Sequence, residues 1–525
     1  MRFTITAIAS ILAAASAVSG LSVEEAREIR PQVEEYLNTL KSRDVEKRNF
    51  CTDHWKTCEN CFEKYPYCHM DNIPSSINWQ TISSTPQLPL NHNTDNMDHG
   101  LSTRGSEAAE PDDGMLLWTI VQDLWDPATN PTGYVSLGIA ENSLMHERLS
   151  EHIHKNLAVP THSFTYGDGM TGSKRLKASL ARFLTGHLKP VTAIQSEHVS
   201  VTNGCSSAIE HLVWALGNPG DGFLLGQPHY GAFVPDVEYR TGCELVPVPF
   251  QDVDPLGAGA AQKYEDALLA SRAKGVKIAA LILCHPHNPL GRCYPRDVIL
   301  DLMRLCQKYD MHLISDEIYA LSVWNNTIDT RPPPVAFESC LSIDTTGVMD
   351  AHRLHVLWGM SKDFGANGIR LGAIISQHNP SFHRSLTPVG IYSSPSSISD
   401  HITANILDDS EWVDGYIAEN QKKLQEHYEL VVAWAKQNGI TYAQGANAAF
   451  FLWIDLGKTY LERHPERKVD DLSGEVMRAL LSKKVFIASG KQFGSERPGW
   501  FRIVFSNKKD LLLEGLKRIV EAIER

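Results

Sequence analysis

Short apolar runs alternate with amphipathic segments between residues 191 and 377. Seven runs are typical of β-strands, and most end in Gly, Pro, Asn, Ser or Asp: HVSVTNG, GFLLGQP, ELVPVPF, IAALILCHP, HLISDEIY, LHVLWGMS and LGAIISQ. Residues 206–216, 264–274 and 295–309 lie between them and place apolar side chains at helical spacing. The alternation predicts an α/β fold with a mostly parallel sheet covered on both faces, which binds ligands at the carboxyl ends of its strands.

The last part of the chain has a different pattern. Long helical stretches at 411–437 and 471–483 are combined with the short strand candidates FFLWIDL and FRIVFS. We therefore predict a large domain over 166–393, a smaller α+β C-terminal domain over 394–525, and an N-terminal arm over 101–165. A cleft between two unequal domains is the expected position of a site.

Composition and charge narrow the class of partner. The 525 residues include 49 Lys and Arg and 62 Asp and Glu, which gives a net charge of −13. An acidic protein repels nucleic-acid phosphates and anionic lipid, so we expect neither nucleic acid nor a membrane as partner. After the first 20 residues no apolar run reaches the roughly 18 residues of a membrane-spanning helix. A small-molecule enzyme is the expectation.

The N-terminus indicates a secretory signal peptide over residues 1–20. Arg2 precedes an apolar run that ends in small residues, the layout of such a peptide. The polar segment and linker over 21–100 then place four cysteines within 18 residues: Cys51, Cys58, Cys61 and Cys68. Two disulfides suit an oxidising route and allow three pairings, whereas a zinc site would use Cys58 and Cys61 with Cys51, Cys68 or His69.

Four motifs in the strand-rich region combine the groups that hold pyridoxal 5'-phosphate. They are Asn288-Pro289-Leu290-Gly291, Asp316-Glu317-Ile318-Tyr319, Ser361-Lys362, and Gly365-Ala366-Asn367-Gly368-Ile369-Arg370. Lys362 is the expected catalytic residue, which bonds the cofactor aldehyde and then acts as general base. Asp316 would pair with the ring nitrogen, and Asn288 and Tyr319 would hydrogen-bond the ring 3'-oxygen. Arg370 would clamp the phosphate. No metal is expected.

Three further places fit the same cofactor or its substrate. Gly204, Cys205 and Ser206 open a helix after a strand, where backbone N–H groups bind phosphate, although a plain glycine turn with a serine cap has the same sequence. Tyr230 could stack on the cofactor ring or be an ordinary buried aromatic residue. Arg502, on a strand candidate, suits a bidentate grip on a substrate α-carboxylate.

With these residues in place, the chain resembles the fold-type I pyridoxal-phosphate enzymes of aminotransferase class I/II, and most closely their 1-aminocyclopropane-1-carboxylate (ACC) synthase-like branch. The resemblance covers about residues 101–525. Besides the motifs above it includes Leu101-Ser102-x-Arg104-Gly105, Gly138-Ile139-Ala140-Glu141-Asn142 and Pro228-His229-Tyr230. It implies the cofactor roles given above, an amino acid substrate that contacts Glu141, and a homodimer whose subunits share residues at the active site.

Two positions depart from that family. The family usually has a serine three residues before its lysine, where this chain has Gly359, so Ser361 or Ser206 would have to compensate in phosphate binding. ACC synthases have Asp-Tyr-His-Gly where this chain has Asp168-Gly169-Met170-Thr171. The tyrosine expected there is missing, and Tyr166 is the candidate to replace it in substrate binding.

These residues leave the reaction open. We expect an aminotransferase, with a C–S β-elimination lyase as the alternative. ACC synthase and a non-catalytic secreted binding scaffold are further alternatives. Localisation is expected in the secretory pathway or outside the cell if the signal peptide is used, and in the cytoplasm otherwise.

The signal peptide can be tested by itself. Residues 1–25 fused to a reporter should carry it into the secretory pathway, because the charged start and apolar run are the features that the export machinery reads. Fractionation of cells that express the fusion is the measurement, and a reporter retained in the cytosol would exclude this route.

Overall fold

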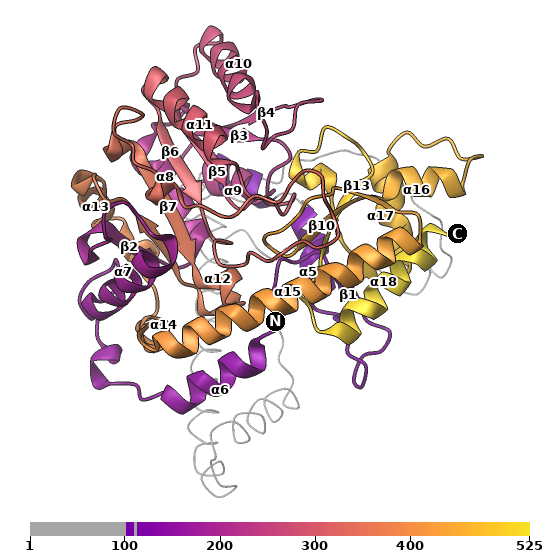
Figure 1. Ribbon diagram of the computed structural model, residues 1–525, viewed down its shortest axis with the longest axis horizontal. Helices are drawn as coiled ribbons and strands as arrows, with labels where there is room; N and C mark the ends of the chain where they lie inside the picture. The colour runs from indigo at the N-terminus through magenta and orange to yellow at the C-terminus, as the bar shows by residue number, and fades with distance from the viewer. Residues whose placement is uncertain (1–100, 110–112, 525) are drawn as a thin grey trace, which may run out of the picture. The chain divides into compact units, whose positions relative to one another are not determined.

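The computed structural model describes residues 101–109 and 113–524 (Figure 1). The predicted signal peptide and the four clustered cysteines lie outside the described residues. The chain divides into two compact units, residues 1–98 and 99–525, and everything below concerns the second. In the described ranges no helix is both long enough and apolar enough to span a membrane.

A seven-stranded sheet forms the centre of this unit, in the order β2-β8-β7-β6-β5-β3-β4. Its strands are β2 (Val199–Thr202), β3 (Gly222–Gly226), β4 (Glu244–Val248), β5 (Ile278–Cys284), β6 (His312–Asp316), β7 (Leu354–Gly359) and β8 (Gly372–Ile375). Each lies in one of the seven predicted runs. All neighbours are parallel except β8, which is antiparallel to both β2 and β7. The predicted mostly parallel α/β fold is confirmed.

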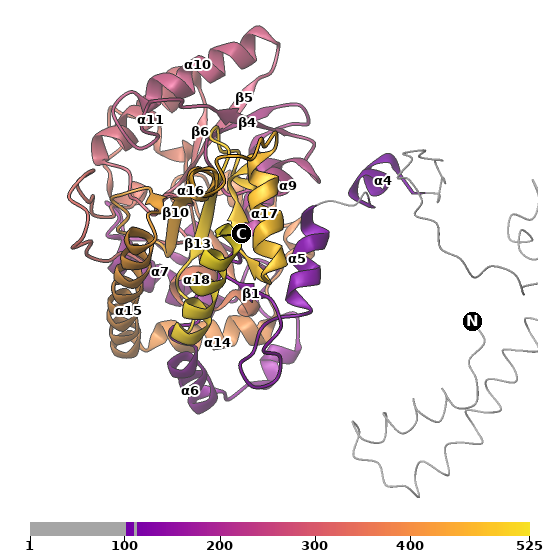
Figure 2. The same ribbon diagram turned by 90° about the vertical axis from the view of Figure 1, so that its right-hand side faces the viewer.

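Helices cover both faces of this sheet (Figures 1 and 2). One face packs against α8 (Cys205–Leu216), α9 (Phe233–Glu238) and α13 (Pro380–Leu386). The other packs against α7 (Lys174–Leu188), α10 (Ala260–Ala273), α11 (Arg296–Tyr309) and α14 (Ser397–Asp408). Within β3, Phe223 and Leu225 pack in the hydrophobic cluster of α8, α9 and α13, whereas Leu224 packs in the cluster of α7, α10, α11 and α14. Successive side chains of a strand point to opposite faces of the sheet.

The C-terminal part forms a second, antiparallel sheet. Its order is β12-β13-β10-β9, with β9 (Thr441–Tyr442), β10 (Phe451–Asp455), β12 (Ala488–Ser489) and β13 (Trp500–Val504). Helices α16 (Leu456–Arg463), α17 (Leu472–Ser482) and α18 (Lys509–Ile523) pack with it in one cluster. The N-terminal strand β1 (Val135–Ser136) pairs in parallel with β11 (Val485–Phe486). Four shorter α-helices are α4 (Thr103–Ala109), α5 (Asp113–Val121), α6 (His146–Asn156) and α12 (Met360–Asp363).

The long helix α15 (Ser410–Gln437) contributes to both cores (Figure 1). Asp409 caps its start, and the Asp409 side chain accepts a hydrogen bond from the Trp412 N–H. Its first half places Val413 and Tyr416 in the cluster of the large sheet, and its second half places Leu424 and Tyr428 in the C-terminal cluster. Helix α14 also packs with the large sheet, although it follows residue 394. The predicted domain boundaries stay a prediction.

Candidate active site

The strand ends bring the predicted site residues to one edge of the sheet. Gly372 at the start of β8 pairs with Thr202 at the end of β2 and with Gly359 at the end of β7. Asp316 ends β6, and Lys362 follows β7 in α12. Since β2, β6 and β7 all run in the same direction, these residues share the carboxyl edge, where an open α/β sheet binds ligands.

Lys362 has an amine that is poised to lose its proton. Its Nζ donates a hydrogen bond to the carbonyl oxygen of Ala140 at 2.6 Å. Burial and the positive charge of Arg502 lower the pKa of this amine to about 8, although Glu141 and Asp316 oppose the shift. Near neutral pH a useful fraction of Lys362 is therefore neutral, as a nucleophile or general base requires. Glu141 is exposed and lies within electrostatic reach of it.

Asp316 is a buried carboxyl group with few compensating contacts. It accepts one backbone hydrogen bond, from Ile318 N–H at 3.3 Å. Burial raises the pKa of Asp316 to about 7, against the opposing effects of that bond and of the Lys362 charge. A protonated ring nitrogen would stabilise this carboxylate, which is the role predicted for it.

The backbone of Gly204, Cys205 and Ser206 at the start of α8 forms, together with Arg370, a candidate phosphate-binding site that we call the cup. Gly204 has a φ of 87°, and no side chain caps the start of α8, so the first N–H groups of the helix are available for an anion. The guanidinium of Arg370 lies directly over Gly204, where any Cβ would collide with it. Ser206 is exposed at the first turn and hydrogen-bonds Asp236, whose pKa burial raises to about 6. Donors of this kind fit a phosphate.

Cys205 and Gly359 explain the missing serine. The Cys205 thiol points away from the cup and contacts the carbonyl oxygen of Trp358 at 3.5 Å. A Cβ at Gly359 would come within 2.8 Å of the Leu371 carbonyl oxygen and 2.9 Å of the Cys205 sulfur. The Leu371 carbonyl oxygen and the Cys205 thiol together leave no room for a serine side chain at 359. Because the Cys205 thiol is engaged with Trp358, we expect its backbone N–H to be its contribution to the cup. Ser361 is buried in α12.

Arg502 on β13 reaches the same site from the antiparallel sheet. It donates hydrogen bonds to Asn288 Oδ1 and to the Gly138 carbonyl oxygen, both at 2.8 Å. Its guanidinium lies between the rings of Phe451 and Phe493, 4.4 and 4.7 Å from their centroids. Its Nε is buried and has no hydrogen-bond partner within the described residues. This unpaired donor fits a substrate carboxylate.

Two phenols lie near this arginine. Tyr319 is buried edge-on against Phe450 and Phe451, and burial raises its pKa well above the ordinary value while the Arg502 charge acts the other way. Tyr230 is partly exposed and packs edge-on against Phe233 at 6.0 Å. The Arg502 charge acts on the pKa of Tyr230 as well, so both phenols lie near the predicted site.

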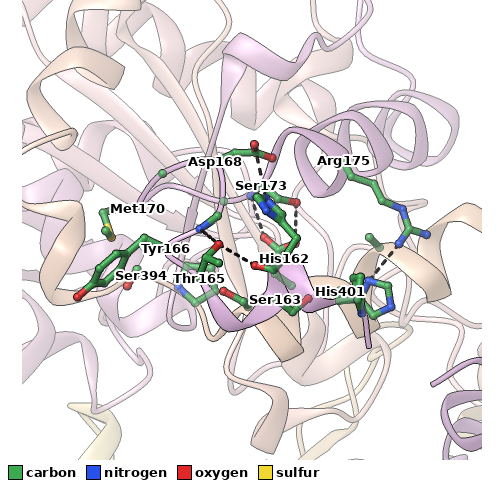
Figure 3. A pocket seen from close by; sticks show the side chains of 18 residues that line it. His162, Ser163, Thr165, Tyr166, Asp168, Met170, Ser173, Arg175, Ser394 and His401 are labelled. Atoms are coloured by element: carbon green, nitrogen blue, oxygen red, sulfur yellow. Dashed lines mark hydrogen bonds and ion pairs between the residues drawn. The ribbon is translucent and has the colours of Figure 1, made fainter. Parts of the chain in front are cut away.

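Tyr166 lies elsewhere, on a pocket of about 240 Å³ that Figure 3 shows. It lies on the side of Met170 and Ser394, while Arg175 and His401 line the other end. None of the cofactor-site residues lines this pocket, and the Tyr166 side chain is 86% exposed. Within one chain the structure does not bring Tyr166 together with Lys362.

Sequence reasoning missed the contacts made by backbone atoms and by unremarkable residues. The carbonyl groups of Gly138 and Ala140 hold Arg502 and Lys362, and Asp236 holds Ser206. The motif from Gly138 to Asn142 was visible, but every residue has a carbonyl group, so its spacing could not reveal this use.

The large, mostly parallel sheet, the smaller antiparallel sheet and the cluster around Lys362 define the class of fold-type I pyridoxal-phosphate transferases. Residues 132–523 match the family described as aminotransferase class I and II. The chain belongs to this family.

Curated relatives have ACC synthase-like names. The chain is 31% identical over 423 residues to the human "probable inactive 1-aminocyclopropane-1-carboxylate synthase-like protein 2", which covers 77% of this chain and 69% of that protein. It is also 31% identical over 415 residues to the mouse "1-aminocyclopropane-1-carboxylate synthase-like protein 1", with 77% and 79% covered. The fold matches that of aspartate aminotransferase from Thermus thermophilus with maleate, with a TM-score of 0.64, 20% identity, and 81% and 99% covered.

The burial of the Asp316 carboxyl group gives a prediction about stability. In the cofactor-free protein, Asp316→Asn should raise the melting temperature by a few degrees at pH 8 and by less at pH 5. The pKa of Asp316 is about 7 in the folded protein and about 3.9 in the unfolded chain. The native protein therefore loses stability as the pH rises from about 3.9 to about 7. Asp301→Asn, at an exposed aspartate, is the control. Parallel melting curves of the wild type and Asp316→Asn across this range would contradict the argument.

Proposed function

We propose that this protein is a pyridoxal 5'-phosphate-dependent aminotransferase that acts on an α-amino acid. The observation that carries the proposal is one buried site that combines the Lys362 amine, the poorly satisfied Asp316 carboxyl and the unpaired Nε of Arg502. A binding scaffold without catalysis would not need an amine with a lowered pKa beside two such groups.

The residues fit the cofactor at each of its functional ends. Asp316 would hold the ring nitrogen in its protonated form, and the cup of Gly204 to Ser206 with Arg370 would hold the phosphate. Asn288 and Tyr319 would bind the ring 3'-oxygen. When bound, pyridoxal 5'-phosphate supplies an electron-withdrawing ring that accepts the electron pair left when the substrate α-proton departs.

The chain's own residues would then position the substrate and move its proton. Arg502 would bind the α-carboxylate, since its guanidinium is held rigidly by Asn288, the Gly138 carbonyl and two aromatic rings. Lys362 Nζ, released from the Ala140 carbonyl, would take the proton from the substrate α-carbon. If Lys362 returned this proton on the cofactor side and water then released an α-keto acid, the first half of a transamination would be complete, and a second α-keto acid would take up the amino group in the other half. Loss of a β-substituent instead would make the same site a lyase.

Absorbance spectroscopy of the full-length protein tests this function. Wild type with added pyridoxal phosphate should develop a near-ultraviolet or visible band that Lys362→Ala lacks, because Lys362 is the lysine that the described residues place beside Asp316 and Arg502. Lys177→Ala is the matched control, since Lys177 also has a pKa lowered by burial but hydrogen-bonds Thr171 in another region. A panel of α-amino acids should then convert the band to the amine form of the cofactor and yield α-keto acids.

The other outcomes contradict the proposal in different ways. Release of pyruvate, ammonia and a thiol from a sulfur amino acid would identify a C–S lyase. A Lys362-dependent band that no amino acid changes would indicate a non-catalytic protein. Absence of any Lys362-dependent band would exclude pyridoxal phosphate as the cofactor of this protein.

We also propose that two copies of the chain associate. Exposed apolar side chains gather on two segments, Phe164 and Tyr166 on the first and Ile391 and Tyr392 on the second. The segments touch, because a Cβ at Gly390 would lie 3.2 Å from Thr171 Cγ2. Apolar surface of this kind is typical of an interface. In such a pair of chains, Tyr166 of one chain would contact the other chain and not its own Lys362.

Sedimentation velocity checks the association. Wild type should sediment with twice the mass of its chain, and the double substitution Ile391→Ser and Tyr392→Ser should shift it toward the single chain, because it removes apolar area from the contact. Leu513→Ser, at a similarly exposed leucine on α18, is the control. A wild type that sediments as a single chain would exclude the proposed dimer.

A further inference from the structure

Glu210, His211 and Ser393 form a chain of hydrogen bonds beside the cup, in which His211 and Ser393 are buried and Glu210 is partly exposed. His211 Nδ1 lies 2.6 Å from Glu210 Oε2, and His211 Nε2 lies 2.5 Å from Ser393 Oγ. Glu210 and His211 are on α8, whereas Ser393 follows the turn at Gly390–Tyr392, 182 residues away in the sequence. Arg240 approaches the other oxygen of Glu210 at 3.6 Å.

The carboxylate fixes the direction of these bonds. A carboxylate only accepts, so Nδ1 of His211 donates its proton to Glu210, and Nε2 shares the other hydrogen bond with the hydroxyl of Ser393. Burial acts to raise the pKa of Glu210, but the hydrogen bond from His211 and the charge of Arg240 outweigh it and hold the pKa below its ordinary value. The acceptor that orients the ring is therefore charged at neutral pH.

Ser393 hydrogen-bonds the polypeptide at two points, one on each side of the cup. Its hydroxyl bonds His211, in the second turn of α8, and its carbonyl oxygen accepts the N–H of Asn203 at 2.6 Å. Asn203 directly precedes Gly204. The first turn of α8, which carries the free N–H groups, thus lies between two fixed points that both depend on the position of Ser393.

Serine, histidine and a carboxylate in this order are also the parts of a hydrolase, but access argues against that use. Ser393 is 6% exposed and His211 is 5% exposed, and the hydroxyl points at a ring that is itself packed inside α8 and its neighbours. A nucleophile must meet its substrate, and this serine is covered. The geometry suits a fixed support better than a second active centre.

We propose that the Glu210–His211–Ser393 chain is a positioning device that sets the cup of Gly204 to Ser206 for the cofactor phosphate. The inference rests on the proposed function, because it assigns that phosphate to the cup. The three residues touch neither cofactor nor substrate. They keep the N–H groups of the helix start in the geometry that a phosphate needs, so their loss weakens binding of the phosphate and leaves the bond to Lys362 intact.

The test compares two ligands that differ only in the phosphate. Dissociation constants for pyridoxal 5'-phosphate and for pyridoxal are measured by absorbance on the full-length wild type, Ser393→Ala, His211→Leu and His211→Gln. Ser393→Ala and His211→Leu should bind pyridoxal phosphate about five- to tenfold more weakly, the usual range for one hydrogen bond, while pyridoxal affinity stays as in wild type. His211→Gln, which keeps a polar end near Ser393, should recover part of the loss.

A matched control separates positioning from general loss of stability. Ser376 is another buried serine that hydrogen-bonds a buried histidine, His355, but it follows β8 at the opposite edge of the sheet. Ser376→Ala should lower the melting temperature without changing the affinity for either ligand. Should Ser393→Ala fail to fold, the two His211 variants carry the comparison.

Each remaining outcome has a defined meaning. Equal weakening for both ligands, or no weakening in Ser393→Ala and His211→Leu, overturns the positioning role and leaves the proposed function intact. A wild type that binds pyridoxal phosphate no better than pyridoxal overturns the assignment of the phosphate to the cup. A wild type that binds neither ligand through Lys362 overturns the proposed function. Covalent labelling of Ser393 by a fluorophosphonate would show that it is a nucleophile and would also overturn the proposal.

Discussion

The close approach of three backbone segments, each at a glycine, determines the geometry of the site. Gly204, Gly359 and Gly372 meet where β2, β7 and β8 end or begin, and a Cβ at Gly372 would come within 2.6 Å of the Gly204 carbonyl carbon. This contact places the start of α8 against the end of β7, so the phosphate cup and the segment of Lys362 become neighbours. The antiparallel strand β8 is required for it, since β8 lies between the two parallel strands that carry these groups.

The same edge concentrates groups that are costly to bury. Lys362, Arg502 and Asp316 all have pKa values shifted by burial toward their uncharged forms. Two positive groups and one carboxyl share a small volume, and the Arg502 charge helps to lower the Lys362 pKa. Such an arrangement reduces stability in the empty protein and is compensated when ligands with opposite charges bind, as is common at functional sites.

Much of this fold could be predicted because its signals are local. Each strand of the large sheet has its own apolar run with a turn residue at its end, and helices such as α11 have their own amphipathic pattern. The reversed direction of β8 could not be predicted, because period-2 patterning does not specify which neighbour a strand pairs with. Chemically distinctive side chains such as Lys362, Asp316 and Arg502 were found for a similar reason. The carbonyl groups of Gly138 and Ala140 were not, since backbone atoms carry no residue signature, and the position of Tyr166 depends on tertiary packing.

The departure at Gly359 shows how one substitution constrains the rest of a cup. The Leu371 carbonyl oxygen and the Cys205 sulfur occupy the space that a side chain at 359 would need, so neither position 359 nor position 205 supplies a hydroxyl donor to the cup. The remaining donors are Arg370, Ser206 and backbone N–H groups, and Ser206 is already engaged with Asp236. Backbone N–H groups bind phosphate well only if the helix start is held still. A cup that depends on its backbone therefore needs support from behind, and Ser393 is bonded to both sides of that helix start.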